Sequence, residues 1–324
     1  MNKIAEQTLI TLIDQLRDTH LLSKEEWMFL IENRTRDVNE YLFSQAREVR
    51  HQHYGHDVYI RGLIEFTNYC KNDCIYCGIR KSNLNACRYR LSETDIQNCC
   101  RTGYELGFRT FVLQGGEDGW FTDQKIISLI EKIKTDFPDC AITLSIGEKE
   151  RESYQAFFDA GADRYLLRHE TYNSTHYGKL HPPALTAAHR QRCLYDLKEI
   201  GYQTGTGFMV GSPYQTAEHL AEDMLFIQQL NPHMVGIGPF IPHHDTPFAA
   251  QPAGTLELTL FMLGLLRLMI PKLLLPSTTA LGTIDPNGKR AWYSCRSKCR
   301  YAKPFSNRCA KRLCALRQQN LYRR

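Results

Sequence analysis

Between residues 57 and 288, short apolar segments of high β propensity alternate with longer helical segments, and this alternation leaves few possible folds. A strand followed by a helix, repeated along a chain, builds a parallel sheet. Seven such units predict an α/β protein with a (β/α)₈ barrel of the TIM type. The strand candidates are residues 58–66, 110–114, 141–147, 164–170, 204–211, 234–240 and 272–279.

An open, doubly wound sheet is the structural alternative. That fold usually has a glycine-rich G-x-G-x-x-G turn after its first strand. In this chain a cysteine-rich segment follows the first strand instead, and polar or charged residues follow the others. In a barrel, the residues after each strand meet at its carboxyl-terminal mouth, so this contrast favours a barrel with a catalytic mouth.

The first 56 residues predict a separate N-terminal helical segment, with apolar residues at helical spacing and a capping box at Ser23–Glu26. We find no Gly/Ser-rich or Pro-rich linker. The longest apolar stretch, residues 256–270, contains Glu257 and Arg267 and is therefore no membrane span. With no apolar leader at the start either, we expect a cytoplasmic protein whose cysteines are reduced.

Cys70, Cys74 and Cys77 have the spacing C-x₃-C-x₂-C, with Tyr76 directly before the third cysteine. A disulfide would leave one cysteine over, and zinc normally needs a fourth ligand, for which only Cys87 lies nearby. Three thiolates on one tight loop suit a [4Fe–4S] cluster with one open iron, which can bind a small chelating cofactor.

This motif resembles the signature of the radical S-adenosylmethionine (SAM) enzymes. The resemblance implies that SAM chelates the open iron and that one electron cleaves it to methionine and a 5′-deoxyadenosyl radical. Further segments, "FVLQGGED", "RYLLRHET", "FMVGSPYQT", "MVGIGPFIPHHDTP" and "PSTTALGTIDPNG", follow in order. Together, over residues 57–288, they resemble the HydE-type maturases of [FeFe]-hydrogenase. The biotin synthases and methylornithine synthases have the same barrel and are the alternatives.

The resemblance implies roles for individual residues at the strand ends. Glycines let a backbone approach a ligand closely, and the "GGE" segment is expected to bind the amino group of SAM. Arg190 is expected to pair with the SAM carboxylate, and Glu170 to contact the ribose. On the residues alone, an ion pair, a helix cap or ordinary packing would explain most of these positions. The predicted cofactor-binding residues are Tyr76, Gly115, Gly116, Glu117, Ser145, Arg168, Glu170, Arg190, Met209 and Met234, and the substrate-facing ones are Arg164, Thr278 and Thr279.

The implied function is reductive cleavage of SAM, with the radical acting on a sulfur-containing or iron–cysteine precursor during maturation of the hydrogenase cluster. The implied partners are a small-molecule or iron-complex substrate, a ferredoxin or flavodoxin as reductant, and other hydrogenase maturases. Biotin-synthase-like sulfur insertion would need a second cluster built from strand cysteines, and the central strands supply no such set. His243 and His244 resemble a metal pair, but their proline-rich loop favours a surface role.

The tail, residues 289–324, does not fit the barrel. It has twelve Lys or Arg and no acidic residue, so it carries +12 while residues 1–288 carry −7. It also contains Cys295, Cys299, Cys309 and Cys314, but no evident eighth strand. We therefore expect the eighth strand to be missing or scrambled.

We expect a change of reading frame near residue 290 to explain the tail. Back-translated with permitted codons and started one base later, the tail can read "GILAGANVVMPN", which resembles the eighth strand of the HydE type. The tail would then be aberrant, and nucleic-acid binding loses its main support. The alternatives are a genuine tail with an auxiliary cluster, or a non-catalytic iron–sulfur or RNA-binding protein that uses the basic charge.

Overall fold

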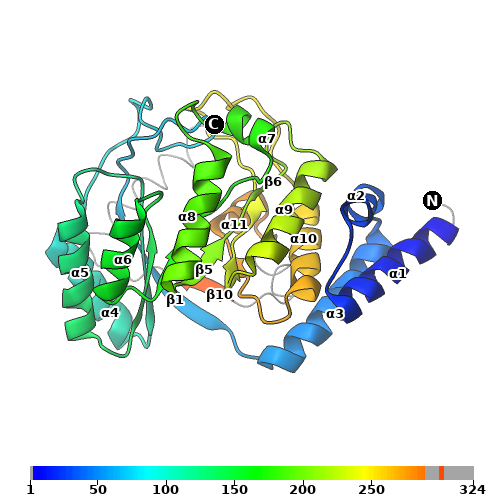
Figure 1. Cartoon of the computed structure of the whole chain (residues 1–324), viewed down its shortest axis with the longest axis horizontal. Coiled ribbons are helices and arrows are strands. Elements are labelled where there is room, and N and C mark those ends of the chain that lie inside the picture. Colours follow the sequence, from blue (N-terminus) through cyan, green and yellow to red (C-terminus); the bar gives the residue numbers. More distant parts are fainter. Residues whose placement is uncertain (1–2, 289–298, 303–324) are drawn as a thin grey trace.

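The computed structural model describes residues 3–288 and 299–302. Three helices come first: α1 (Lys3–Thr19), α2 (Lys24–Asn33) and α3 (Arg36–Tyr54). Ser23 caps α2 in a reciprocal capping box with Glu26, as the sequence predicts. Figure 1 shows these helices in blue beside the barrel. Their apolar faces pack on its later helices α9 (Ala217–Leu230) and α10 (Leu256–Met269).

The barrel prediction is confirmed. Parallel strands pair in the order β7-β5-β4-β3-β2-β1-β10-β9. The amide of Val235, on β7, donates to the carbonyl of Leu274, just before β9, so the two ends of the sheet meet and the barrel closes. The strands are β1 (Tyr59–Thr67), β2 (Thr110–Gly115), β3 (Ala141–Ser145), β4 (Arg164–Leu166), β5 (Gln203–Thr206), β7 (Met234–Val235), β9 (Pro276–Ser277) and β10 (Cys299–Ala302). The remaining helices are α4 (Glu93–Glu105), α5 (Asp123–Asp136), α6 (Arg151–Asp159), α7 (Ser174–Leu180), α8 (Ala187–Ile200) and α11 (Thr279–Ile284).

Two predicted strands are each divided in two. After β5 and β7 the chain leaves the main sheet, and β6 (Met209–Val210) pairs with β8 (Gly238–Pro239) in a second, two-stranded sheet. The break lies where Gly207 meets Gly236, because a Cβ on Gly207 would overlap the carbonyl oxygen of Gly236. The two backbones therefore touch, and the chain turns into the mouth of the barrel.

The eighth position is irregular. The sequence predicts an eighth strand that is missing or scrambled, and among the described residues the tail contributes the four-residue β10 there, paired with β1 from Tyr59 to Gly62 and with β9. Residues of the tail therefore do occupy this place. The first residues of β1 stay poorly covered, since Tyr59 and Ile60 are 48% and 49% exposed. The rest of the tail, including the predicted aberrant sequence, lies outside the described residues, and the reading-frame interpretation stays a prediction.

In the described part of the chain, no helix has the length and apolarity that crossing a lipid bilayer demands. Although α10 is buried nearly all round, it is short and packs against α3 and α1. Gly264 makes this packing possible, because a Cβ there would lie 3.0 Å from the side chain of Leu42. The apolar character of α10 therefore reflects burial between the barrel and the N-terminal helices.

Candidate functional site

The three predicted cluster cysteines lie together on the loop after β1. The amide of Cys77 donates to the carbonyl of Cys74 at 3.2 Å, which makes the loop tight. Burial raises the pKa of Cys77 to about 11 and raises that of Cys74 further, and the neighbouring thiols add to both shifts. Cys74 and Cys77 therefore ionise readily only when a cation compensates them, so the loop fits a metal cluster.

Arg88 holds the cysteine loop in place through hydrogen bonds to its backbone. Its guanidinium donates to four backbone carbonyls within the loop region, at distances of 2.5 to 3.2 Å. Gly78 leaves room for the imidazole of His243, because a Cβ there would lie 2.5 Å from the ring. His243 therefore packs against the cysteine loop and is no free surface residue. The possible ligand atoms of His243, His244 and Asp245 lie within 4.8 Å of one another, with His244 at the surface.

The "GGE" segment after β2 lies directly against the cysteine loop. A Cβ on Gly116 would overlap the carbonyl oxygen of Tyr69 and lie 2.8 Å from the Cβ of Cys70, so only glycine fits here. Glu117 contacts the same loop twice: its carbonyl accepts from the amide of Lys71 at 2.9 Å, and its carboxylate pairs with the Lys71 ammonium at 3.2 Å.

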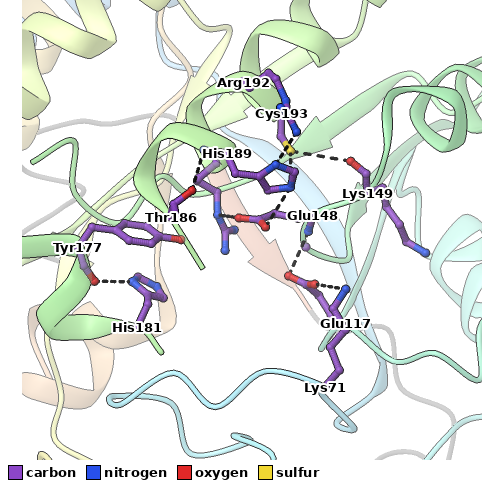
Figure 2. Close-up of polar contacts among 12 residues, drawn as sticks. Lys71, Glu117, Glu148, Lys149, Tyr177, His181, Thr186, His189, Arg192 and Cys193 are labelled. Atoms are coloured by element: carbon purple, nitrogen blue, oxygen red, sulfur yellow. Dashed lines mark hydrogen bonds and ion pairs between the residues drawn. The ribbon is translucent and has the colours of Figure 1, made fainter. Parts of the chain in front are cut away.

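Glu148, which the sequence analysis did not assign, links two predicted cofactor residues (Figure 2). Its carboxylate pairs with Nε of Arg190 at 2.6 Å, and its amide donates to the Glu117 carboxylate at 3.1 Å. Both Glu148 and Arg190 are buried. The only signal in the sequence was the place of Glu148 shortly after the third strand.

His189 contacts Glu148 on the side away from Glu117. Arg192 donates to Nδ1 of His189 at 2.7 Å, so Nδ1 is the acceptor and Nε2 carries the proton. That nitrogen faces the Glu148 carboxylate at 3.4 Å. The carboxylates of Glu148 and Glu117 therefore both lie near the buried guanidinium of Arg190.

Glu170 follows β4 in an unusual backbone conformation, with φ at 65°. Its amide donates to the carbonyl of Gly207 at 3.0 Å, and its carboxylate pairs with Arg168 at 3.2 Å. The preceding His169 is anchored behind it by a buried contact with Asp223 at 3.2 Å. Since left-handed backbone is costly for a residue with a side chain, these contacts are needed to hold the Glu170 carboxylate at the mouth.

Tyr76, on the cysteine loop, contacts His181, which the sequence analysis also missed. The carbonyl of Tyr177 can only accept, so Nδ1 of His181 donates to it at 3.1 Å. Nε2 is then the acceptor for the Tyr76 hydroxyl at 3.4 Å. Burial lowers the pKa of His181 to about 3, so this histidine stays neutral. The predicted contact residue Met209 packs beside Tyr76.

Other predicted residues lie elsewhere in the barrel. Arg164 begins β4 and donates to Gln203 and Thr110, the first residues of β5 and β2, at 2.7 and 3.1 Å. It therefore lies at the amino ends of the strands, away from the cysteine loop, and its substrate-facing role stays a prediction. Met234 begins β7, where its sulfur accepts a hydrogen bond from Arg61.

The remaining predicted residues end their strands at the mouth. Ser145 ends β3, half buried, and Thr278 follows β9. The Thr278 hydroxyl is buried, points at Gly238 and does not cap α11. Thr279 is exposed. Of the threonine pair, Thr278 is therefore the better placed to contact a ligand inside the barrel.

Several polar atoms at the mouth of the barrel are buried without a hydrogen bond to the described residues. Eight such atoms have no hydrogen-bond partner in the part of the chain that the structure describes, although five of them take part in ion pairs. Native proteins leave few such atoms, so their concentration here indicates a polar ligand beside the cysteines. The five in ion pairs are Glu117 Oε2, Glu148 Oε1, Arg168 Nη2, Glu170 Oε2 and Arg190 Nε, and the other three are Arg168 Nε, the Tyr177 hydroxyl and Thr278 Oγ1.

We expect Glu148→Gln to destabilise the apoprotein by about 2–4 kcal/mol, because it leaves the buried Arg190 cation without its nearest carboxylate. Chemical denaturation measures the change. Glu199→Gln is the matched control, since Glu199 pairs with Arg151 at 2.8 Å on the surface, where water screens the pair. Equal effects of the two substitutions would contradict a structural role for the buried pair.

Comparison with known proteins gives consistent results. The family model described as the Radical SAM superfamily matches residues 64–227. The chain is 45% identical over 260 residues to the [FeFe] hydrogenase maturase subunit HydE of Thermotoga maritima, covering 80% of this chain and 74% of that protein.

Solved structures show the same fold. The crystal structure of methylornithine synthase (PylB) matches with a TM-score of 0.82 at 25% identity, over 90% of this chain and 86% of that one. The structure of HydG, a maturase of the [FeFe]-hydrogenase, matches with a TM-score of 0.80 at 20% identity, over 93% of this chain and 69% of that one. At that identity the second match supports the fold alone.

Proposed function

The chain belongs to the HydE family within the radical SAM superfamily, and on this premise we propose that it is a maturase of [FeFe]-hydrogenase that cleaves SAM reductively. The observation that carries the proposal is the meeting of three cysteines with unpartnered polar atoms at the mouth of one barrel. A bare cluster carrier would have no use for a half-buried Glu117 and a buried Glu148 and Arg190 beside its ligands.

Each residue has a definite task in this proposal. Cys70, Cys74 and Cys77 hold a [4Fe–4S] cluster, and Glu117 binds the SAM amino group while its ion pair with Lys71 fixes its carboxylate. Arg190, oriented by Glu148, receives the SAM carboxylate. When bound, the cluster and SAM supply a 5′-deoxyadenosyl radical. The barrel orients them and keeps water from the reaction.

We expect the substrate to bind inside the barrel, near the residues that would hold the cofactor. We propose a sulfur-containing or iron–cysteine precursor, with the buried Thr278 hydroxyl as a contact for its carboxylate. A ferredoxin or flavodoxin would supply the electron, and other hydrogenase maturases would be its partners in a cytoplasmic pathway. In domain terms, we propose that residues 57–288 carry the catalytic part of the barrel, that residues 1–56 are a helical support, and that the tail, residues 289–324, is aberrant in sequence although it contributes β10 to the sheet.

We expect the anaerobically reconstituted protein, given a strong reductant, to release 5′-deoxyadenosine from SAM, as measured by chromatography. Glu117→Gln should weaken SAM binding about tenfold or more, because it removes one charged hydrogen bond, while the cluster stays intact. Glu93→Gln, on an exposed ion pair of α4, is the control. A wild-type protein with a full cluster and no 5′-deoxyadenosine would favour a cluster carrier.

A further inference from the structure

Tyr177 is a buried residue whose hydroxyl proton is not used in the fold. It lies on α7 and is 1% exposed. Its hydroxyl oxygen is near enough to Arg190 to accept from the guanidinium, but within residues 3–288 and 299–302 no group accepts the hydroxyl proton. A buried donor without an acceptor costs free energy, so its retention suggests that a ligand supplies the acceptor.

The hydroxyl faces the carboxylate-binding side of the site. In Figure 2 the hydroxyl end of Tyr177 turns toward Glu148, with His181 at the other end of the residue. Arg190 and Glu148 are near enough to interact electrostatically with it. Glu148 uses only Nε of Arg190, and a guanidinium has four further N–H donors. A hydroxyl donor and a cation therefore lie side by side.

The ring of Tyr177 is held rigidly. It stacks on the imidazole of His181, with centroids 3.8 Å apart and planes at 18°. His181 is itself bonded to the Tyr177 carbonyl and to the Tyr76 hydroxyl of the cysteine loop. The position of the Tyr177 hydroxyl is therefore tied to the loop that holds the cluster, which is how a binding group is preorganised.

We propose that the Tyr177 hydroxyl donates a hydrogen bond to the carboxylate of SAM, beside Arg190, and is a cofactor-binding residue. A carboxylate accepts from a phenol and pairs with a guanidinium at once. The inference rests on the proposed function, which supplies SAM as the ligand. It adds the Tyr177 hydroxyl as a second donor to the SAM carboxylate, beside Arg190, which was predicted from the sequence.

The test is Tyr177→Phe, which removes one oxygen atom. The wild type and the variant are each prepared in two versions, one with the tail of the given sequence and one with the frame-restored tail described below. All are reconstituted anaerobically and titrated with SAM, S-adenosylhomocysteine and 5′-methylthioadenosine. We expect the variant to bind the first two roughly tenfold more weakly, as for loss of a hydrogen bond to a charged group. Binding of 5′-methylthioadenosine, which lacks the carboxylate, should not change.

A second readout needs no cofactor. Because the hydroxyl donates to no protein group and only faces Arg190, Tyr177→Phe should change the melting temperature of the apoprotein little. Tyr202→Phe is the matched control: Tyr202 is equally buried, but its hydroxyl donates to the carbonyl of Tyr154 at 2.7 Å, so its loss should lower the melting temperature and leave SAM binding unchanged.

The outcomes separate the two proposals. Equal SAM affinity of wild type and Tyr177→Phe would overturn this inference alone, as would an equal loss of 5′-methylthioadenosine binding, which would indicate a disturbed ring. A wild-type protein that holds its cluster and binds no SAM would overturn the proposed function and this inference with it.

Discussion

Cys74→Ser should leave the protein without its iron–sulfur cluster. A serine hydroxyl does not replace a buried thiolate as an iron ligand, and three cysteines are the least that can hold a [4Fe–4S] cluster with one open iron. Iron and sulfide analysis and the visible absorption of the anaerobically reconstituted variant measure the loss. SAM cleavage should then vanish as well, because its electron passes through the cluster.

Cys87→Ser provides the control for this experiment. Cys87 is exposed, lies on the same stretch of chain and was the only nearby candidate for a fourth ligand. We expect this variant to keep its full cluster. If Cys74→Ser retained the iron and Cys87→Ser lost it, the assignment of the ligands would be wrong.

Restoring the reading frame near residue 290 should convert a poorly soluble chain into a well-folded one. The frame-restored tail begins "GILAGANVVMPN", whose apolar residues suit a buried strand. A domain has only about 5–15 kcal/mol of net stability, and each large apolar side chain buried contributes roughly 1.5–3 kcal/mol. Burying the apolar side chains of an eighth strand therefore contributes about as much free energy as the net stability of the domain, and we expect a chain without them to aggregate.

The structure adds a reason for this expectation. Tyr59 and Ile60 are half exposed at the start of β1, beside the position that the eighth unit occupies. Apolar surface at a strand end invites association between chains. A following helix of the restored tail would be expected to cover such surface.

Three versions should be expressed side by side: the chain as printed, the frame-restored chain, and a chain ending at Gly288. Soluble yield and thermal melting are measured for each. The third version separates the loss of a strand from damage done by the basic tail. A printed chain that is soluble and melts cooperatively, no worse than the restored one, would show that the tail is genuine.

Much of the fold followed from periodicity. Strand–helix alternation predicted the barrel, and the capping box at Ser23 located the start of α2. The divided strands could not be predicted, because the break depends on contact between Gly207 and Gly236, which lie on different strands. The strand within the tail was missed because its backbone pairing with β1 does not require apolar residues.

The candidate site likewise has residues that could be predicted from the sequence and residues that could not. The cysteines were recognisable because their spacing is local. Glu148, His181 and Tyr177 were missed because each acts through a residue distant in sequence, and no spacing records such contacts. Arg164 shows a limit of strand-end reasoning: a charged residue in a strand suggests the mouth, but its hydrogen bonds lie at the amino ends of the strands, and its substrate-facing role stays a prediction.

The contact of Gly116 with the cysteine loop joins the two halves of the proposed site. The segment expected to bind SAM rests directly on the segment expected to bind iron, and Lys71 ties the two together. Neither segment can shift without displacing the other. A substitution that moves the cysteine loop is therefore expected to weaken the binding of the cluster and of SAM together, even where it touches only one of them.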